Sequence, residues 1–209
     1  CTWSCVAGSR SRGNLDAMRR ESEFPGDRSV VKDLRESGAQ TARERIGGLL
    51  DDGSFVEIDA FVRHRSGDHN MHLHTPLGDG VVAGHGMIDG RRVACFSQDY
   101  SVFSGTMGEM HARKITKIVE FAEKSRLPII GIWDGDGQRA HEGVTSLGST
   151  GELLDVLVSC SGKIPTISIV LGTVSGTSAL AAGLSDFVIL GRARGRMFMR
   201  SPYVIPEIM

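Results

Sequence analysis

The 209-residue chain lacks several features that would identify whole classes of protein. Its net charge is −1 at pH 7, so it has no basic excess with which to attract nucleic acid or an anionic membrane surface. Its longest apolar runs, such as IPTISIVLG, are far shorter than the roughly 20 residues that a membrane-spanning helix needs. No stretch has the order of charged, apolar and small residues found in a signal peptide. We therefore expect a cytoplasmic protein that binds neither nucleic acid nor membrane.

Cysteine is also scarce, with four residues in the chain. Cys1 and Cys5 lie near the start, while Cys95 and Cys160 fall inside a predicted strand and a predicted helix. This spacing does not form a disulfide framework and fits buried free thiols in a cytoplasmic protein. The chain also has no G-x-S-x-G motif and no cysteine with a matching His and Asn context, so it offers no catalytic triad.

Residues 1–40 are rich in Arg, Ser, Glu and Gly and show little apolar periodicity. This composition predicts a polar arm that is poorly ordered or helical, with one short helix over NLDAMRRESEF. We expect the folded domain to occupy residues 41–209.

The rest of the chain alternates between strand-like and helix-like patterns. A helix at TARERIGGLL is followed by a strand at 54–59, and two β-rich runs are joined by Asp89-Gly90, a strong hairpin signal. A helix over 108–124 precedes an alternation of strand, helix, strand, helix and strand that ends near residue 191. This order predicts an α/β fold with a mostly parallel, buried sheet.

A glycine-rich loop, WDGDGQRAHEG, follows the predicted buried strand LPIIGI. Gly135-x-Gly137-x-x-Ala140 matches a dinucleotide fingerprint, but it comes in mid-chain after a hairpin, and Gly143 would interrupt the helix that should begin there. A tight turn whose glycines serve only backbone geometry is a second interpretation. A third is an oxyanion hole, in which backbone N–H groups stabilise a thioester enolate.

The third interpretation gains support from a second junction of the same kind. GTVSGTSA, residues 172–179, leads from a strand into a helix whose free N–H groups and positive dipole end favour an anion. Two such junctions on adjacent parallel strands would lie side by side at the carboxyl edge of the sheet.

Histidine clusters in HRSGDHNMHLH, as His64, His69, His72 and His74. No Cys and no carboxylate other than Asp68 is placed to complete a tetrahedral site there, and Cys1-x-x-x-Cys5 lacks a second cysteine pair. We therefore predict a His-rich polar loop and no metal site.

Four stretches carry a family resemblance: TARERIGGLLDDGSFVEID, GDGVVAGHGMIDGRRVACFSQDYSVFSGTMGEMHARKITKIVEFA, PIIGIWDGDGQRAHEGVTSL and SDFVILGRARGRMFMRSP. In this order and spacing they resemble the N-terminal half of the carboxyltransferase β subunits of biotin-dependent acyl-CoA carboxylases. The resemblance runs from Thr41 to the end of the chain.

The resemblance implies a crotonase-like (ClpP/crotonase) spiral of ββα units. It implies a carboxyltransferase, which transfers a carboxyl group from carboxybiotin to the α-carbon of an acyl-CoA. The protein then supplies mainly positioning and oxyanion stabilisation. It further implies biotin on a partner protein, coenzyme A as part of the substrate, and no metal. The implied partners are a biotinylated carrier or biotin carboxylase subunit, a C-terminal carboxyltransferase half absent from this chain, and further copies in a homo-oligomer.

The resemblance also assigns site residues by position. The loop from Gly135 to Arg139 stands where the family has a Ser-Gly-Gly-Ala-Arg run that holds the thioester oxygen, and Arg139, Glu142 and Gly143 match that pattern. The residues assigned to catalysis are Asp136, Gly137, Gly176 and Thr177. The residues assigned to substrate binding are Gly135, Gln138, Arg139 and Ser175, together with Arg113 and Lys114 on a basic helix face near the family's coenzyme A site; a solvated helix face would explain those two equally well.

These loops depart from the family pattern: Asp136 replaces Gly, Gln138 replaces Ala and Thr177 replaces Gly, and Thr173-Val174 stands where the family has Pro-Cys. An ionised carboxylate about 4 Å from an enolate would cost roughly 4 kcal/mol at an effective dielectric near 20, or about a thousandfold in rate. Two alternatives therefore stay open: a catalytically altered homologue that serves as a subunit or scaffold, and a malonyl-type thioester decarboxylase that needs no biotin.

Overall fold

The structure, a computed structural model, describes residues 3–200 of the chain. Cys1 and the last nine residues of the predicted domain, 201–209, lie outside the described residues.

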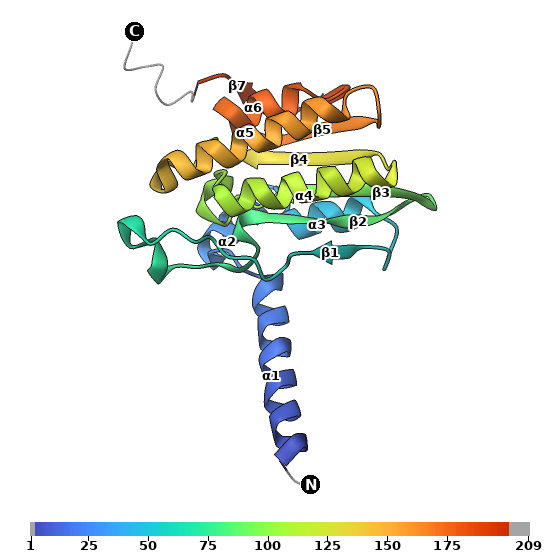
Figure 1. Cartoon of the computed structure of the whole chain (residues 1–209). Helices are drawn as coiled ribbons and strands as arrows, with labels where there is room; N and C mark the ends of the chain where they lie inside the picture. Colours follow the sequence, from blue (N-terminus) through green and yellow to red (C-terminus); the bar gives the residue numbers. More distant parts are fainter. Residues whose placement is uncertain (1–2, 201–209) are drawn as a thin grey trace.

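The described strands form one seven-stranded sheet (Figure 1). The antiparallel part contains β1 (Val56–Ile58), β2 (Val81–Ile88) and β3 (Arg91–Gln98). The parallel part adds β4 (Ile129–Gly135), β5 (Thr166–Ser175) and β6 (Phe187–Leu190) to β3 in that order, and β7 (Arg196–Phe198) pairs in parallel with the end of β5. The prediction of a mostly parallel α/β sheet is confirmed.

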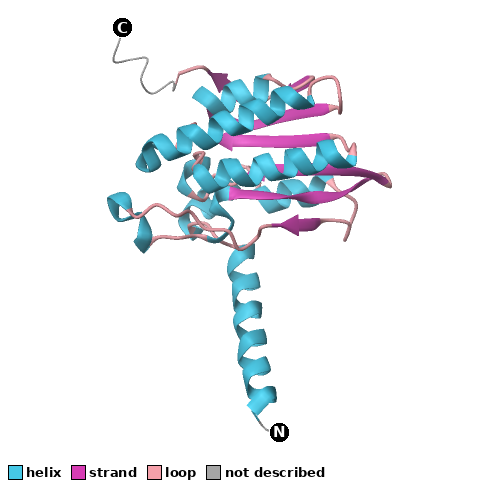
Figure 2. Ribbon diagram, in the orientation of Figure 1, coloured by secondary structure: helices cyan, strands magenta, loops and turns pink. Residues whose placement is uncertain are grey.

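Helices cover both faces of this sheet (Figures 1 and 2). One face carries α4 (Glu109–Ser125), α5 (Gly143–Cys160) and α6 (Gly176–Gly183), and the other carries α3 (Ala42–Leu49). Successive strand residues point to opposite faces, which separates the two cores. In β3, Ala94 and Phe96 pack under α4, whereas Val93 and Cys95 pack under α3.

The hairpin and the first helix of the domain form where their local signals lie. Asp89 (φ 49°) and Gly90 (φ 73°) adopt the left-handed conformation that a two-residue hairpin turn of type I′ requires, so that prediction is confirmed. The Asp51 carboxylate after α3 accepts both turn N–H groups, at 3.0 and 2.9 Å. Thr41 and Glu44 form a capping box at the start of α3. These contacts fix α3 against the hairpin.

The arm contains two helices, α1 (Trp3–Glu23) and α2 (Arg28–Glu36). The sequence predicts only a short helix here, but α1 is 21 residues long and projects away from the sheet (Figure 1). Many of its residues are Arg, Glu, Met and Ala, which favour helix without any apolar stripe. The division of the chain at residue 40 stays a prediction.

Short 3-10 turns lie in the predicted polar loop and beside the glycine-rich loop: η1 (Asp68–Leu73), η2 (Leu77–Gly80), η3 (Phe103–Gly105) and η4 (Ala140–Glu142). No helix within residues 3–200 has both the length and the hydropathy to cross a membrane.

The edge strand β6 is apolar and uncovered. Its four residues, Phe187, Val188, Ile189 and Leu190, are between 37% and 64% exposed, although successive residues point to opposite faces. An exposed apolar edge strand without a charge or proline is a surface on which other segments readily pair.

Candidate functional site

The two predicted junctions lie side by side. Gly135 at the end of β4 is in register with Val174 of β5, and α6 begins two residues later. A Cβ atom on Gly137, which has φ 84°, would lie 3.0 Å from the Ser175 carbonyl oxygen. The loop after β4 therefore passes directly against the start of α6, as the sequence predicts.

The loop after β4 also contacts the segment before α4 through backbone alone. A Cβ atom on Gly135 would lie 2.1 Å from the Gly105 carbonyl oxygen, and one on Gly105 would lie 2.2 Å from the Asp134 carbonyl oxygen. No side chain fits between these two backbone segments, so both positions need glycine.

Only some N–H groups of this loop are free. The Asp136 N–H donates to the Ser104 carbonyl at 3.2 Å, and the Arg139 N–H donates to Met107 at 3.0 Å. The Asp136 N–H is therefore not available to a thioester oxygen in this structure. The N–H groups of Gly137 and Gln138 donate no hydrogen bond within the described part of the chain.

The second junction presents the N-terminus of α6. Its cap residue Ser175 makes no side-chain capping bond, and Gly176 has φ 59°. N–H groups in the first turn of a helix have no acceptor within the helix and lie at its positive end. Together with Gly137 and Gln138, the first turn of α6 supplies N–H donors from both junctions.

Two of the residues that depart from the family pattern, Gln138 and Thr177, contact each other. The Thr177 hydroxyl lies 2.9 Å from Gln138 Oε1, and the Thr150 hydroxyl of α5 lies 3.1 Å from the same atom. Gln138 Nε2 is buried and has no hydrogen-bond partner within the described residues.

A further such residue, Asp136, is half-buried. Burial and the neighbouring Asp134 raise the pKa of the Asp136 carboxyl. Asp134 is itself paired with Arg45 of α3, at 2.5 Å. Both effects oppose ionisation, so Asp136 takes up a proton at a higher pH than an exposed aspartate does.

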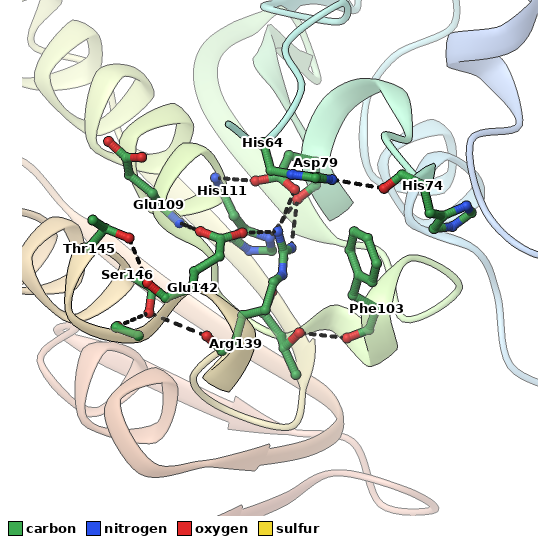
Figure 3. Close-up of polar contacts among 12 residues, drawn as sticks. His64, His74, Asp79, Phe103, Glu109, His111, Arg139, Glu142, Thr145 and Ser146 are labelled. Carbon is green, nitrogen blue, oxygen red and sulfur yellow. Dashed lines mark hydrogen bonds and ion pairs between the residues drawn. The ribbon is translucent and has the colours of Figure 1, made fainter. Parts of the chain in front are cut away.

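Arg139, which the resemblance assigns to substrate binding, is buried in an ion-pair network (Figure 3). Its Nη1 atom lies 2.6 Å from Asp79 Oδ1 and 2.8 Å from Glu142 Oε1, and Nη2 donates to the Thr106 carbonyl at 3.0 Å. The guanidinium also stacks 4.6 Å from the centre of the Phe103 ring. The side chain is 1% exposed, so its charge is engaged in these internal contacts, and its assignment to substrate binding stays a prediction.

The same network caps α4. Glu142 Oε2 accepts the Glu109 N–H at 2.6 Å, and Asp79 Oδ2 accepts the His111 N–H at 2.8 Å. The helix's own cap residue, Gly108, has no side chain to offer, and a Cβ there would lie 2.5 Å from the Arg139 guanidinium. Two carboxylates therefore accept backbone N–H groups from the first turn of α4, and the Arg139 guanidinium forms an ion pair with each of them.

A chain of hydrogen bonds continues from this network to the sheet. His111 Nδ1 lies 3.0 Å from the Asp79 carbonyl oxygen, and Nε2 lies 3.2 Å from Gln98 Nε2. Gln98 Oε1 in turn accepts the Asp134 N–H at 3.0 Å. These partners fit a neutral ring with its proton on Nδ1, and burial lowers the pKa of His111 to about 3.

Arg113 and Lys114 do not share an exposed basic face. Lys114 is buried, its Nζ donates to the Val81 carbonyl at 2.7 Å, and burial lowers its pKa to about 8. Arg113 is exposed and pairs with Glu109. Consecutive residues of a helix point in different directions. The prediction that Lys114 lies with Arg113 on a basic face of the helix was therefore wrong.

The histidine loop has its own contacts. His64 Nε2 lies 2.8 Å from the His74 carbonyl oxygen, and His72 Nδ1 lies 3.3 Å from the Gly67 carbonyl oxygen. Among residues 3–200, no three His, Cys, Asp or Glu side chains are grouped so that they could hold a metal ion. Cys95 and Cys160 are buried free thiols, and burial raises the pKa of Cys95 to about 12, which suppresses the nucleophilic thiolate.

Replacing Arg139 by methionine should destabilise the protein by about 3–5 kcal/mol, because Asp79 and Glu142 would be left buried and unpaired. Urea unfolding measures this change. Arg113→Met is the control, since Arg113 is exposed and its loss should cost no more than about 1 kcal/mol. Equal effects of the two substitutions would contradict a structural role of Arg139.

The buried neutral His111 should make stability fall in acid. Below pH 6.5 the unfolded chain protonates this histidine, while the folded chain does so only near pH 3, so stability is lost as pH falls through that window. The loss is at most about 1.4 kcal/mol for each pH unit. Burial raises the pKa of Asp79, which acts in the opposite sense, so the informative quantity is a difference between two proteins.

Urea unfolding of the wild type and of His111→Gln, repeated between about pH 4.5 and 7.5, isolates this contribution. The free energies of unfolding of the two proteins should converge as pH falls, since only the wild type loses the contribution of a buried neutral His111. His141→Gln, at an exposed position, is the control. Parallel curves for the wild type and His111→Gln would contradict the prediction.

Comparison with known proteins places this site in a family. Residues 33–209 match the family model described as the carboxyl transferase domain. The chain is 45% identical over 194 residues to a Mycobacterium tuberculosis protein named biotin-dependent acetyl-/propionyl-coenzyme A carboxylase beta5 subunit, covering 93% of this chain and 35% of that protein. It is 40% identical over 183 residues to the methylmalonyl-CoA decarboxylase subunit alpha of Veillonella parvula, covering 88% of this chain and 36% of the relative.

A solved structure of transcarboxylase 12S, with methylmalonyl-coenzyme A bound, superposes on this chain with a TM-score of 0.89 and 35% identity. The match covers 94% of this chain and 38% of that one, so the chain spans about a third of the length of its relatives. The crotonase-like fold that the resemblance predicts is confirmed by these neighbours. The chain belongs to the carboxyl transferase domain family, as its loop sequences and its paired junctions both indicate.

Proposed function

We propose that this chain is the acyl-CoA-binding part of a carboxyltransferase that transfers a carboxyl group from carboxybiotin to the α-carbon of an acyl-CoA. The observation that carries the proposal is the pairing of two sets of free N–H donors, at Gly137 and Gln138 and at the first turn of α6. A thioester oxygen placed between them would gain negative charge as an enolate forms, and each donor of this kind contributes about 10²–10³ in rate.

The donor set fits this chemistry, because it consists of backbone N–H groups, and residues 3–200 contain no group of carboxylates and imidazoles that could hold a metal ion. Biotin, held by a partner protein, supplies the carboxyl group when it is bound. This chain's residues orient the thioester and stabilise its enolate oxygen. The titratable groups around the loop are already engaged: Arg139 and Glu142 bond each other, and His111 is buried and neutral. Of the titratable side chains in the loop 135–139, Asp136 is the one that makes no hydrogen bond or ion pair within the described residues.

A C-terminal carboxyltransferase half is the partner that we propose for β6. The chain spans about a third of the length of its relatives, and the apolar residues Phe187–Leu190 lie uncovered on both faces of an edge strand. Covering such an edge removes apolar surface from water and satisfies unpaired backbone groups. We also propose that the assembly is a homo-oligomer with a biotinylated carrier or biotin carboxylase subunit, since the related transcarboxylase 12S is described as a hexamer.

Asp136 supports a second candidate function, a thioester decarboxylase acting on a malonyl-type substrate. Decarboxylation forms the same enolate, and a carboxyl with a raised pKa beside it could donate the proton that the product needs. The relative from Veillonella parvula carries the name of a decarboxylase subunit. This reaction needs the oxyanion hole but no carboxybiotin.

The first test is calorimetric titration with propionyl-CoA, with NADH as the control. We expect binding with a dissociation constant on the order of micromolar, about −8 kcal/mol, and no response to NADH. The complete assembly is then assayed for carboxylated product with a carboxylated carrier, and for carbon dioxide release from malonyl-CoA without the carrier. Transfer supports the first function and release alone supports the second. A folded assembly with neither activity would identify a scaffold subunit.

Substitution of Asp136 separates the two activities. If the ionised carboxylate opposes the enolate, Asp136→Gly and Asp136→Asn should both raise the transfer rate, by at most about a thousandfold. The same variants should lower decarboxylation, because they remove the proton donor. Asn keeps the size of the side chain and serves as the matched control for charge. Unchanged rates in both assays would show that the Asp136 side chain takes part in neither reaction.

A charged substitution tests whether β6 contacts the proposed C-terminal half. Ile189→Lys, at a position that is 53% exposed, should abolish co-purification with the part of a carboxyl transferase chain that follows the matched region, because the interface would bury an unpaired ammonium. Leu73→Lys is the control at a 76% exposed position in η1. Equal retention of the partner by both variants would exclude β6 from the interface.

A further inference from the structure

Gln138 joins three elements at the candidate site. It lies in the loop after β4, and its Oε1 atom is contacted by the hydroxyls of Thr177 in α6, at 2.9 Å, and Thr150 in α5, at 3.1 Å. These residues are 39 and 12 positions away in the chain. One side chain therefore connects the two junctions to each other and to the helix between them.

The other side of the loop is already fixed. The Gly137 carbonyl accepts the Met107 N–H at 2.7 Å, and the Arg139 N–H donates to the Met107 carbonyl at 3.0 Å. These two bonds hold the loop to the segment before α4, and the N–H groups of Gly137 and Gln138 take part in neither bond. Without the Gln138 side chain, the described hydrogen bonds include none between this loop and α6.

The contacts of Gln138 do not depend on the orientation of its amide. Thr150 has one hydroxyl proton, which it donates to the Ser146 carbonyl at 2.8 Å, so with the amide turned over Gln138 Nε2 donates to the Thr150 hydroxyl. In either orientation the side chain connects the loop to α5 and α6. Alanine, the residue that stands here in the family pattern, would make neither contact, and these contacts point to a role of Gln138 in the site.

We propose that Gln138 is a positioning residue: its clamp on Thr177 and Thr150 sets the spacing between the two groups of N–H donors that bind the thioester oxygen. This inference rests on the proposed function and deepens it. Donors that are held before the reaction act on the charge that develops in the transition state, so loss of the clamp affects turnover more than substrate binding. The two departures Gln138 and Thr177 then form one unit, in which either residue is of little use without the other.

The kinetic test uses the complete assembly and four variants: Gln138→Ala, Thr177→Val, the double variant, and Thr177→Ser. We expect each of the first two to lower kcat by about tenfold to a hundredfold with KM changed by less than about twofold. The double variant should be no slower than the worse single variant, because both remove the same interaction. Thr177→Ser keeps the hydroxyl and should recover most of the rate that Thr177→Val loses.

Unchanged kcat in Gln138→Ala would overturn the proposal, and so would effects that multiply in the double variant. A rise in KM at constant kcat would show uniform substrate binding and would also overturn it.

A second measurement needs no activity. Hydrogen exchange of the backbone amides at 136–139 and 176–178 should be faster in Gln138→Ala than in the wild type, in both segments at once. Thr116→Val is the control, since the Thr116 hydroxyl bonds only within α4. Faster exchange in one segment alone, or in neither, would overturn the clamp. If the assembly shows no carboxyl transfer but both segments loosen together, the proposed function fails while the clamp stands.

Discussion

The buried ion pairs of Arg139 are the interaction on which the site depends. One guanidinium neutralises Asp79, from the turn before β2, and Glu142, from the turn before α5, and these two carboxylates cap the first turn of α4 (Figure 3). A buried pair of this kind has a large desolvation penalty, so it adds little stability compared with apolar packing. What it does provide is a unique arrangement, because removal of any partner leaves a buried charge unmatched.

The network also explains why the glycine-rich loop has its observed course. Arg139 is the last residue of that loop, and its side chain runs under α4 while its N–H bonds Met107. On the other side, Asp134 is tied to Arg45 and to Gln98, which is linked to His111 and thus back to Asp79. The loop is therefore held at both ends by buried polar groups. Between those ends Gly137 and Gln138 are left with free N–H groups beside the start of α6.

Asp136 and Gln138, two residues that depart from the family pattern, lie between the held ends of this loop, and Thr177 lies beside Gln138 in α6. The Asp136 N–H donates to the Ser104 carbonyl, and burial and the neighbouring Asp134 raise the pKa of the Asp136 carboxyl. Gln138 and Thr177 replace two small residues with a hydrogen-bonded pair. In the proposed function these side chains change how a thioester is positioned, while the backbone N–H donors of Gly137 and Gln138 remain without acceptors among the described residues.

Local patterns in the sequence were sufficient for most strands and helices after residue 40 and for the pairing of the two glycine-rich junctions, but not for the length of α1 or for β7. Apolar periodicity, the Asp89-Gly90 turn and the Thr41–Glu44 box act between neighbours in the chain, and the two glycine-rich junctions follow strands that the pattern identifies. The roles of charged side chains were decided only by tertiary structure. Arg139 and Lys114 look like surface cations in sequence, but their partners Asp79 and Val81 lie 60 and 33 positions away. Periodicity carries no information about such pairs, because burial of a charge depends on what the fold brings to it from elsewhere in the chain.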